Sequence, residues 1–298
     1  MTDATPAVMR RRLRIQLRRM RENLDLTQRA AADAMDWSLS KLIRIEAGMV
    51  NISTNDLRAL LGYYGVDDVP EVDDKVEVAR VARTKSLWSP YRDIVSSDYV
   101  DYLEYESSAK TVRVFQNTYV PGLLQTEEYA QEVLKVATDN DLNRVGQLWE
   151  LRRMRQDRLL RDNGPTLQFV LDEAVIRRSA AGPEKMARQL EHLLAVNTRP
   201  NVTIRIVPFT EGIYPLMEAP YYHLEFNHPD DPSISFEERP SGDLVQREDD
   251  TDSGEGPPPV GTPQHYLGNF YYLERITRIG DTSAMIRDAI ARFRGTAP

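Results

Sequence analysis

The sequence predicts an α+β protein in which an all-α N-terminal domain is followed by a mixed α/β domain with a small sheet. Two short, capped helical segments at residues 27–48 place the helical domain at the N-terminus. Alternating apolar residues typical of a strand are clearest at Asn201–Val207. A polar break at residues 66–70 separates the two parts, and a length of 298 residues suits two domains. The predicted organisation is a helical domain at 1–66, a linker helix at 67–90 and the mixed domain at 91–298.

The segment 27–48 has the pattern of two short helices joined by a tight turn and closed by Gly48. Thr27 and Ser38 can each cap a helix by accepting hydrogen bonds from the free amides of its first turn. In the second helix, Leu42 and Ile45 share an inward face. The outward face carries Ser40, Lys41 and Arg44. This layout is typical of a DNA-binding helix-turn-helix, whose second helix enters the major groove.

Residues 9–66 resemble the XRE-type helix-turn-helix domain of phage and plasmid repressors. The resemblance is carried by Leu26-Thr27-Gln28 and by Ile45-Glu46-Ala47-Gly48. It implies that Arg21 pairs with Glu46 and holds the first helix against the recognition helix. The sequence departs from the family pattern at Asp36, where glycine is usual, and at Leu39, where a polar base-reading side chain is common. A leucine can still contact a thymine methyl group.

These patterns predict a set of DNA contacts and an oligomeric state. Base edges are expected to meet Ser40, Lys41 and Arg44, and Arg44 can bind guanine through two hydrogen bonds. Gln28 and Ser38 are expected to bind phosphates or to support the recognition side chains. A homodimer on a palindromic operator in double-stranded DNA is predicted, because one domain this small binds weakly alone. The full predicted set of DNA contacts is Gln28, Ser38, Leu39, Ser40, Lys41 and Arg44. The alternative interpretation of residues 27–48 is that they form only a helical hairpin within a larger core.

Charge is unevenly distributed along the chain. Residues 1–66 hold eleven basic and seven acidic residues, a net charge of +4, whereas the whole chain carries −8. The remaining residues therefore carry −12. A basic end on an acidic protein fits a domain that meets phosphates. The arginines that crowd the first helix have either this role or that of a solvated face; they are Arg10, Arg11, Arg12, Arg14, Arg18 and Arg19.

Beyond residue 66, strand-like and helix-like segments alternate. A helix is predicted from Pro70 to Ser86, and Tyr99, Tyr102 and Tyr105 form a helical stripe that suits a core more than a ligand cage. The predicted strands are Thr111–Thr118, Thr166–Leu171, Asn201–Val207, Tyr221–Phe226 and Ser233–Glu237. Further helices are predicted at Thr126–Ala137, Asp141–Asp162, after Asp172, and at Pro183–Val196, Gln264–Arg278 and Ser283–Arg294. Residues 240–263 are rich in Pro, Gly and acidic residues and are predicted to form a flexible acidic loop.

A second resemblance begins at Val120-Pro121-Gly122-Leu123-Leu124-Gln125-Thr126 and continues through ordered stretches such as Leu171-Asp172-Glu173-Ala174. These stretches resemble the effector-type domain that follows an XRE helix-turn-helix in WhiJ-like regulators of actinobacteria. The resemblance implies a regulator of development or secondary metabolism. It also implies a small protein partner encoded by a neighbouring gene, in an antitoxin-like arrangement.

Two interpretations apply to the heptapeptide. Structurally, Pro-Gly makes a turn, Leu123 and Leu124 are buried, and Gln125 or Thr126 caps the next helix. Functionally, the turn and the tyrosine stripe could enclose a small-molecule or peptide pocket. The arginines after residue 150 either pair with carboxylates or form an anion or partner site. The candidate effector or partner residues are Pro121, Gly122, Leu123, Leu124, Gln125, Arg152 and Arg155.

The sequence argues against several other classes. There is no cysteine, so disulfides and thiolate sites are excluded. The four histidines lack metal-ligand spacing, and no phosphate-binding glycine loop or nucleophile elbow is present. We therefore expect no metal, no cofactor and no enzymatic activity. Without an apolar run of membrane-spanning length or a signal peptide, a cytoplasmic, nucleoid-associated protein is expected.

Two hypotheses remain for the function. The first is a sequence-specific transcriptional regulator whose C-terminal domain senses a ligand or binds a small protein. The second is an antitoxin-like or signalling interaction protein whose main role is to bind a small partner, with DNA binding secondary.

Overall fold

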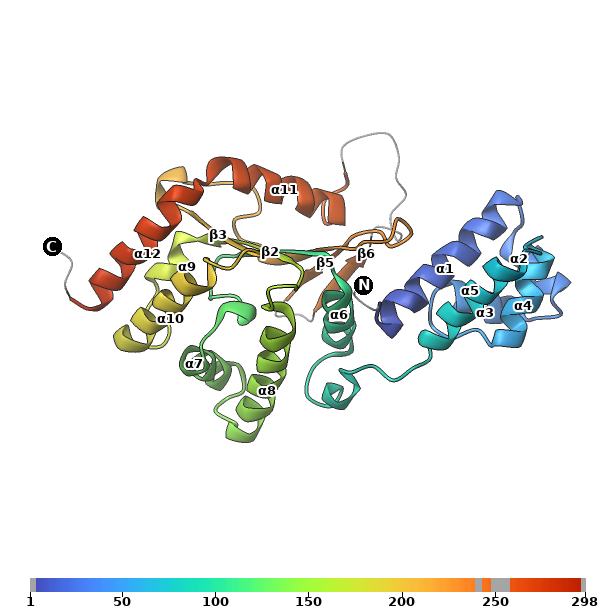
Figure 1. The fold of residues 1–298 in the computed structure, drawn as a ribbon, viewed down its shortest axis with the longest axis horizontal. Helices are drawn as coiled ribbons and strands as arrows, with labels where there is room; N and C mark the ends of the chain where they lie inside the picture. The colour runs from blue at the N-terminus through green and yellow to red at the C-terminus, as the bar shows by residue number, and fades with distance from the viewer. Residues whose placement is uncertain (1–3, 239–242, 248–257, 296–298) are drawn as a thin grey trace. The chain divides into compact units, whose positions relative to one another are not determined.

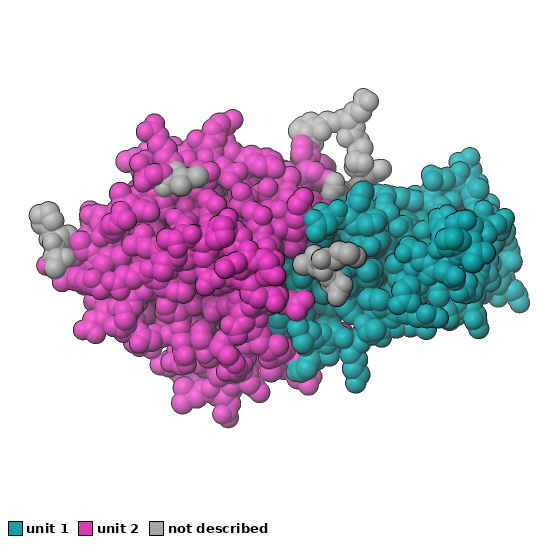
Figure 2. Space-filling view, in the orientation of Figure 1, with its two compact units in different colours: residues 1–90, 100–108, 226–232 teal, residues 91–99, 109–225, 233–298 magenta. Residues whose placement is uncertain are grey.

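The computed structural model describes residues 4–238, 243–247 and 258–295. Its chain forms two compact units, which are coloured separately in Figure 2. Unit 1 comprises residues 1–90, 100–108 and 226–232, and unit 2 comprises residues 91–99, 109–225 and 233–298. The predicted α+β class is confirmed, because a helical N-terminal region precedes a domain that combines a mixed sheet with helices.

Unit 1 is built around short helices with polar caps. Its helices are α1 (Pro6–Asn23), α2 (Gln28–Ala34), α3 (Leu39–Glu46), α4 (Thr54–Tyr63), α5 (Val69–Val81) and most of α6 (Ser97–Ser108). The predicted caps are present: the Thr27 hydroxyl accepts from the Ala30 amide at 3.1 Å and the Ser38 hydroxyl from the Lys41 amide at 3.2 Å. Leucines from α1, α3 and α4 form the core, and these are Leu13, Leu17, Leu42, Leu57, Leu60 and Leu61.

Residues 67–90, predicted as a linker helix, do not simply link two domains. The helix α5 contributes Val76, Val78 and Ala79 to the same buried core as α1, α3 and α4. It begins at Val69, where Asp68 caps it and Pro70 occupies its first turn. The helical domain therefore extends past residue 66, because α5 covers apolar surface that four helices would leave exposed.

Unit 2 contains a six-stranded mixed sheet. Its strands are β1 (Thr111–Gln116), β2 (Thr166–Asp172), β3 (Val202–Val207), β4 (Tyr221–Glu225), β5 (Ile234–Glu237) and β6 (Leu244–Arg247), in the order β3-β2-β1-β4-β5-β6. The first three strands pair in parallel, and β4, β5 and β6 are antiparallel to their neighbours. The five predicted strands are thus confirmed as β1 to β5.

Helices cover both faces of this sheet. They are α7 (Glu127–Ala137), α8 (Leu142–Leu159), α9 (Glu173–Arg177), α10 (Pro183–Val196), α11 (Pro263–Ile276) and α12 (Ile279–Phe293), with 3₁₀ turns η1 (Ser89–Tyr91), η2 (Gly122–Leu124) and η3 (Phe209–Glu211). The helix α11 lies over one face, and α7, α8 and α10 lie on the opposite side (Figure 1). None of the helices in the described residues is long and apolar enough to cross a membrane.

The predicted flexible loop at 240–263 is wrong in part. Leu244–Arg247 form β6, which pairs with β5 in register Ser235 to Gln246. Pro263 already belongs to α11. The remainder of that prediction falls largely on residues 240–242 and 248–257, which lie outside the described residues.

Candidate functional site

The two helices α2 and α3 meet at a tight turn that fixes the start of α3. Asp36 in this turn has φ of +52°, the left-handed conformation in which glycine is favoured and aspartate is tolerated. Gly48 closes the motif with φ of +72°. Between these turns, Leu42 and Ile45 point into the core of unit 1. The opposite face of α3 is therefore presented outward.

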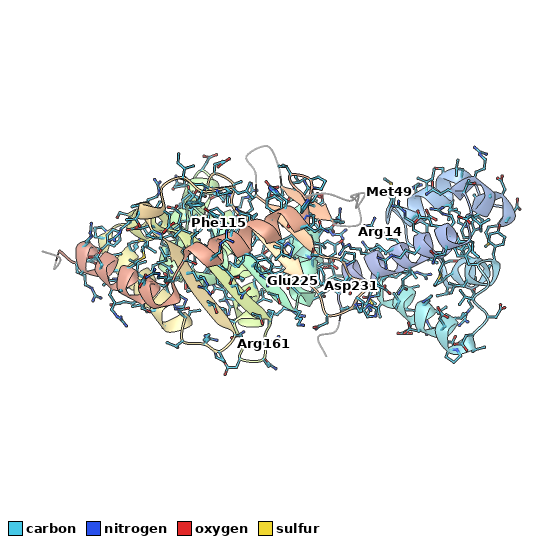
Figure 3. The ribbon with its side chains drawn as sticks, turned by 90° about the horizontal axis from the view of Figure 1, so that it is seen from above. Arg14, Met49, Phe115, Arg161, Glu225 and Asp231 are labelled. Atoms are coloured by element: carbon cyan, nitrogen blue, oxygen red, sulfur yellow. The ribbon has the colours of Figure 1, made fainter. Side chains whose placement is uncertain are left out.

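The outward face of α3 carries a mixed polar and apolar surface. Ser40 and Arg44 are exposed, as is Ile43 one turn beyond Ser40. Among the described residues, the Arg44 side chain forms no hydrogen bond or ion pair, so its five donors are available to a ligand. Met49, labelled in Figure 3, follows the helix and is 72% exposed. This surface offers hydrogen-bond donors for base edges and apolar groups for thymine methyls.

Lys41 and Leu39 are less available than the sequence suggested. The Lys41 ammonium lies 3.1 Å from Asp56 Oδ2 and 3.9 Å from the centre of the Trp37 ring. Leu39 is half-buried. Both residues are thus held against neighbouring parts of unit 1, whereas Ser38, Ser40 and Arg44 extend into solvent.

The predicted pair between Arg21 and Glu46 is present and buried. Arg21 donates from Nε and Nη2 to the two Glu46 carboxylate oxygens at 2.7 and 2.9 Å, a bidentate arrangement. The hydrogen bond to Glu46 raises the pKa of Arg21. Gln28 also donates to Glu46, at 2.7 Å. Gln28 therefore holds the carboxylate at the C-terminal end of α3, and its predicted contact with DNA stays a prediction.

The arginines of α1 are largely engaged within unit 1. Arg12 donates to both Asp231 oxygens at 3.0 and 2.5 Å, and Arg19 lies 3.1 Å from Asp230. Arg18 pairs with Glu22. These carboxylate partners argue against the interpretation of this cluster as a free phosphate-binding surface. No local sequence pattern indicates Asp230 and Asp231 as partners, because they lie more than 200 positions away from these arginines.

The heptapeptide at residues 120–126 forms a turn whose backbone groups are hydrogen-bonded by the side-chain amides of Gln125, Gln156 and Gln189. We call this segment the clamped turn. Gln125 Nε2 donates to the Val120 carbonyl at 2.6 Å, and Gln156 Nε2 donates to the Gly122 and Gln125 carbonyls. From α10, Gln189 donates to the Leu124 carbonyl and accepts from the Thr126 amide, both at 2.7 Å. Leu123 and Leu124 are buried, as the structural interpretation predicted. The segment Pro121–Gln125 itself is therefore a buried support.

A cavity of about 290 Å³ lies beside this turn in unit 2. Three arginines line it, Arg144, Arg152 and Arg155, together with Tyr99 and the carboxylates of Glu238 and Asp243. Its apolar wall includes Ile94, Leu148 and Leu151. The predicted candidates Arg152 and Arg155 thus meet one residue of the tyrosine stripe. The other two members of the stripe, Tyr102 and Tyr105, are buried, as expected of core residues.

The two central arginines of the cavity are held differently. Arg155 is buried and donates from Nη1 to the Tyr99 hydroxyl at 2.6 Å. Arg152 donates from Nη1 to Gln125 Oε1, within the clamped turn. Burial lowers the pKa of Arg152 from its ordinary value, although an arginine stays charged near neutral pH. The arrangement can bind an anion, whereas no cluster of metal ligands occurs among the described residues.

Two known protein families match this chain, one in its N-terminal part and one in the part that follows. A family model described as a helix-turn-helix domain matches residues 12–74. A second model, described as a domain of unknown function (DUF5753), matches residues 99–255. Searches of curated proteins and of solved structures found no match. Because the second model covers more than half of the 298 residues, the chain belongs to the DUF5753 family, here with a helix-turn-helix domain at its N-terminus.

Proposed function

We propose that this protein is a sequence-specific DNA-binding transcriptional regulator. The observation that carries the proposal is the outward face of α3, where Arg44 and Ser40 are exposed in a capped, rigidly supported helix-turn-helix. The match of residues 12–74 to a helix-turn-helix domain supports the same role. No catalytic function is part of the proposal.

Within this proposal, Arg44 reads a guanine through two hydrogen bonds and Ile43 contacts a thymine methyl group. Ser40 bonds to a neighbouring base edge. Ser38 and Lys41 lie at the edges of the same surface and bind the DNA backbone, Lys41 by exchanging Asp56 for a phosphate. Leu39 keeps the start of α3 packed rather than reading a base.

The protein is proposed to act as a homodimer on a palindromic operator. Each recognition helix would occupy one major-groove half-site, with the half-sites about 10 bp apart or a multiple of this spacing. In this proposal the protein resembles the WhiJ-like regulators. Binding of a ligand or partner to unit 2 changes the affinity of the protein for DNA.

A second role of unit 2, binding of a small protein, is favoured by a separate observation. The connection between β3 and β4 exposes three apolar side chains, Phe209, Ile213 and Met217, and Ile213 is 94% exposed. Apolar side chains mark a protein-protein contact site when they form one contiguous exposed patch. If unit 2 serves mainly this purpose, a small protein from a neighbouring gene should co-purify in equal amounts, and Ile213→Ser should release it.

The regulator proposal is tested by the Arg44→Ala variant. Binding to the operator should weaken by about 1–3 kcal/mol, and discrimination at one base position should be lost. The matched control is Arg58→Ala, since Arg58 is exposed on α4 and pairs with Asp73. Equal weakening of Arg44→Ala on operator and random DNA would reduce Arg44 to a backbone contact.

A further inference from the structure

We propose that the cavity in unit 2 binds a small organic anion, whose charged group pairs with Arg152 and whose apolar body lies against Leu148 and Leu151. This inference rests on the proposed role of unit 2 as an effector domain and names the class of its ligand. The helix α8 provides five of the lining residues, and the others come from residues 94–96, Tyr99 of α6, residues 137–138, Glu238 and Asp243.

Among the described residues, no carboxylate pairs directly with Arg152, although the charge of Glu238 acts on it. Its hydrogen bond goes to the neutral amide oxygen of Gln125, and it forms no ion pair within the described residues. The adjacent Arg153 is different, because it pairs with Glu150 and Asp157 on the exposed side of α8. A partly buried guanidinium that has no direct carboxylate partner is stabilised when an anion enters beside it.

The clamped turn positions this guanidinium. Gln125 accepts from Arg152 while its own amide group donates to the Val120 carbonyl at 2.6 Å, so the orientation of Gln125 is fixed. Gly122 gives room for the arginine, since a Cβ atom at this position would lie 3.1 Å from Arg152 Nε. Pro121–Gln125 are thus positioning residues for Arg152. Groups that are held before the ligand arrives lose little freedom on binding.

The other lining groups limit the ligand's charge. Arg144 and Arg155 add positive charge, while Glu238 and Asp243 add negative charge. Arg155 lies with its guanidinium 5.7 Å from the Tyr99 ring, and Asp243 accepts from Ser96. Three arginines against two carboxylates leave one positive charge in excess, which suits a monoanion more than a polyphosphate.

The volume of the cavity limits the ligand's size. About 290 Å³ corresponds to roughly ten water molecules at about 30 Å³ each. This is close to the lower end of the range for small-molecule sites, about 300 Å³. The apolar wall formed by Leu148, Leu151 and Ile94 favours a carbon skeleton beside the charged group. A compact carboxylate fits these limits, and a peptide or dinucleotide does not.

The experiment uses ligand-observed NMR titrations of the full-length protein with benzoate and with benzamide, its neutral analogue of the same shape. Benzoate should bind with a Kd at least tenfold lower than benzamide, because only benzoate can pair with Arg152. Arg152→Gln should raise the benzoate Kd at least tenfold. The control Arg153→Gln, on the exposed side of the same helix, should leave it unchanged.

A second variant tests the cavity while leaving Arg152 in place, so that the proposal does not depend on the folding of Arg152→Gln alone. Leu148→Phe fills the cavity without touching the clamped turn and should weaken benzoate binding at least fivefold. The proposal is overturned if benzamide binds as well as benzoate, if Arg152→Gln retains wild-type affinity in a folded protein, or if inorganic phosphate binds as tightly as benzoate. No DNA is present in these titrations, so their failure is distinct from failure of the regulator proposal.

Discussion

At the scale of single residues, the recognition helix depends on one buried ion pair. Arg21 and Glu46 expose only 8% and 3% of their side chains, and Gln28 completes the hydrogen bonding of the glutamate. Such a pair is costly to break, because a partner left alone remains as an uncompensated buried charge. The pair of Arg21 and Glu46 was predicted from the resemblance to XRE-type domains, whereas the hydrogen bond from Gln28 to Glu46 was not.

Glu46→Gln should lower the free energy of unfolding by about 3–5 kcal/mol, since Arg21 would lose its counter-charge in a buried position. Urea unfolding monitored by circular dichroism measures this change. The control is Glu22→Gln, whose side chain is 47% exposed and should change stability by less than about 1 kcal/mol. Similar losses in both variants would contradict the assigned role of the buried pair.

His223 gives unit 2 a dependence on pH. It is fully buried on β4 with Nδ1 3.1 Å from the Ser235 hydroxyl, and it faces Arg113 and Glu225. Burial is the main cause that lowers its pKa to about 4, with a further contribution from Arg113, while Glu225 acts in the opposite direction. Between about pH 6.5 and pH 4 the unfolded chain therefore binds a proton that the folded chain lacks.

Stability should accordingly fall as the pH is lowered through this window and be fully present above it. Between pH 7 and pH 5, the wild type should lose about 2 kcal/mol more than His223→Gln, which lacks the titrating group. Urea unfolding at the two pH values gives both losses. Equal losses would mean that His223 is protonated in the folded protein.

At the scale of elements, most helices and strands could be predicted from the sequence. Their apolar residues recur at the spacing of a helix or a strand, and capping residues mark where the helices begin. The helix α10 begins and ends at the predicted residues, Pro183 and Val196, and β3 lies within the predicted Asn201–Val207. The strand β6 was missed, because its four residues lie in a polar, proline-rich stretch and depend on pairing with β5. Such pairing is a tertiary effect that local pattern does not contain.

The clamped turn at 120–126 offers a test at this scale. Gln189→Met removes a buried amide that satisfies the Leu124 carbonyl and the Thr126 amide. Two backbone groups would lose their partners, so the free energy of unfolding should fall by about 2–4 kcal/mol. Gln131→Met on α7 is the control, since its amide contacts only the exposed Glu127 within the described residues. A neutral effect of Gln189→Met would show that water replaces the clamp.

At the scale of the whole molecule, distant segments complete the helical unit. Residues 226–232 and 100–108 belong to unit 1, where Glu104 accepts from the Ala7 amide at 2.8 Å and Asp231 pairs with Arg12. The sequence assigned both segments to the second domain. Their place in unit 1 could not be predicted from the sequence. The local pattern around Asp230 and Asp231, for example, does not indicate which helix this turn contacts. For the same reason, the sequence interpretation of a pocket between the turn and the tyrosine stripe singled out Arg152, Arg155 and Tyr99 but missed Arg144, Glu238 and Asp243.

Asp231→Asn should therefore destabilise the N-terminal unit although it lies in the second half of the chain. The Asp231 side chain is 4% exposed, and we expect a loss of about 3 kcal/mol. Hydrogen exchange of α1 amides in the full-length protein would locate the loss. The exposed pair of Arg58 and Asp73 provides the control Asp73→Asn, for which exchange in α1 should stay unchanged.

Recognition of a specific DNA sequence by α3 can be tested by selecting genomic DNA fragments on the purified full-length protein. At near-physiological salt the wild type should enrich one palindromic site, with half-sites separated by about one helical turn or a multiple of it. Arg44→Ala should lose preference at one position of each half-site. Enrichment no greater than that of shuffled DNA would contradict the claim.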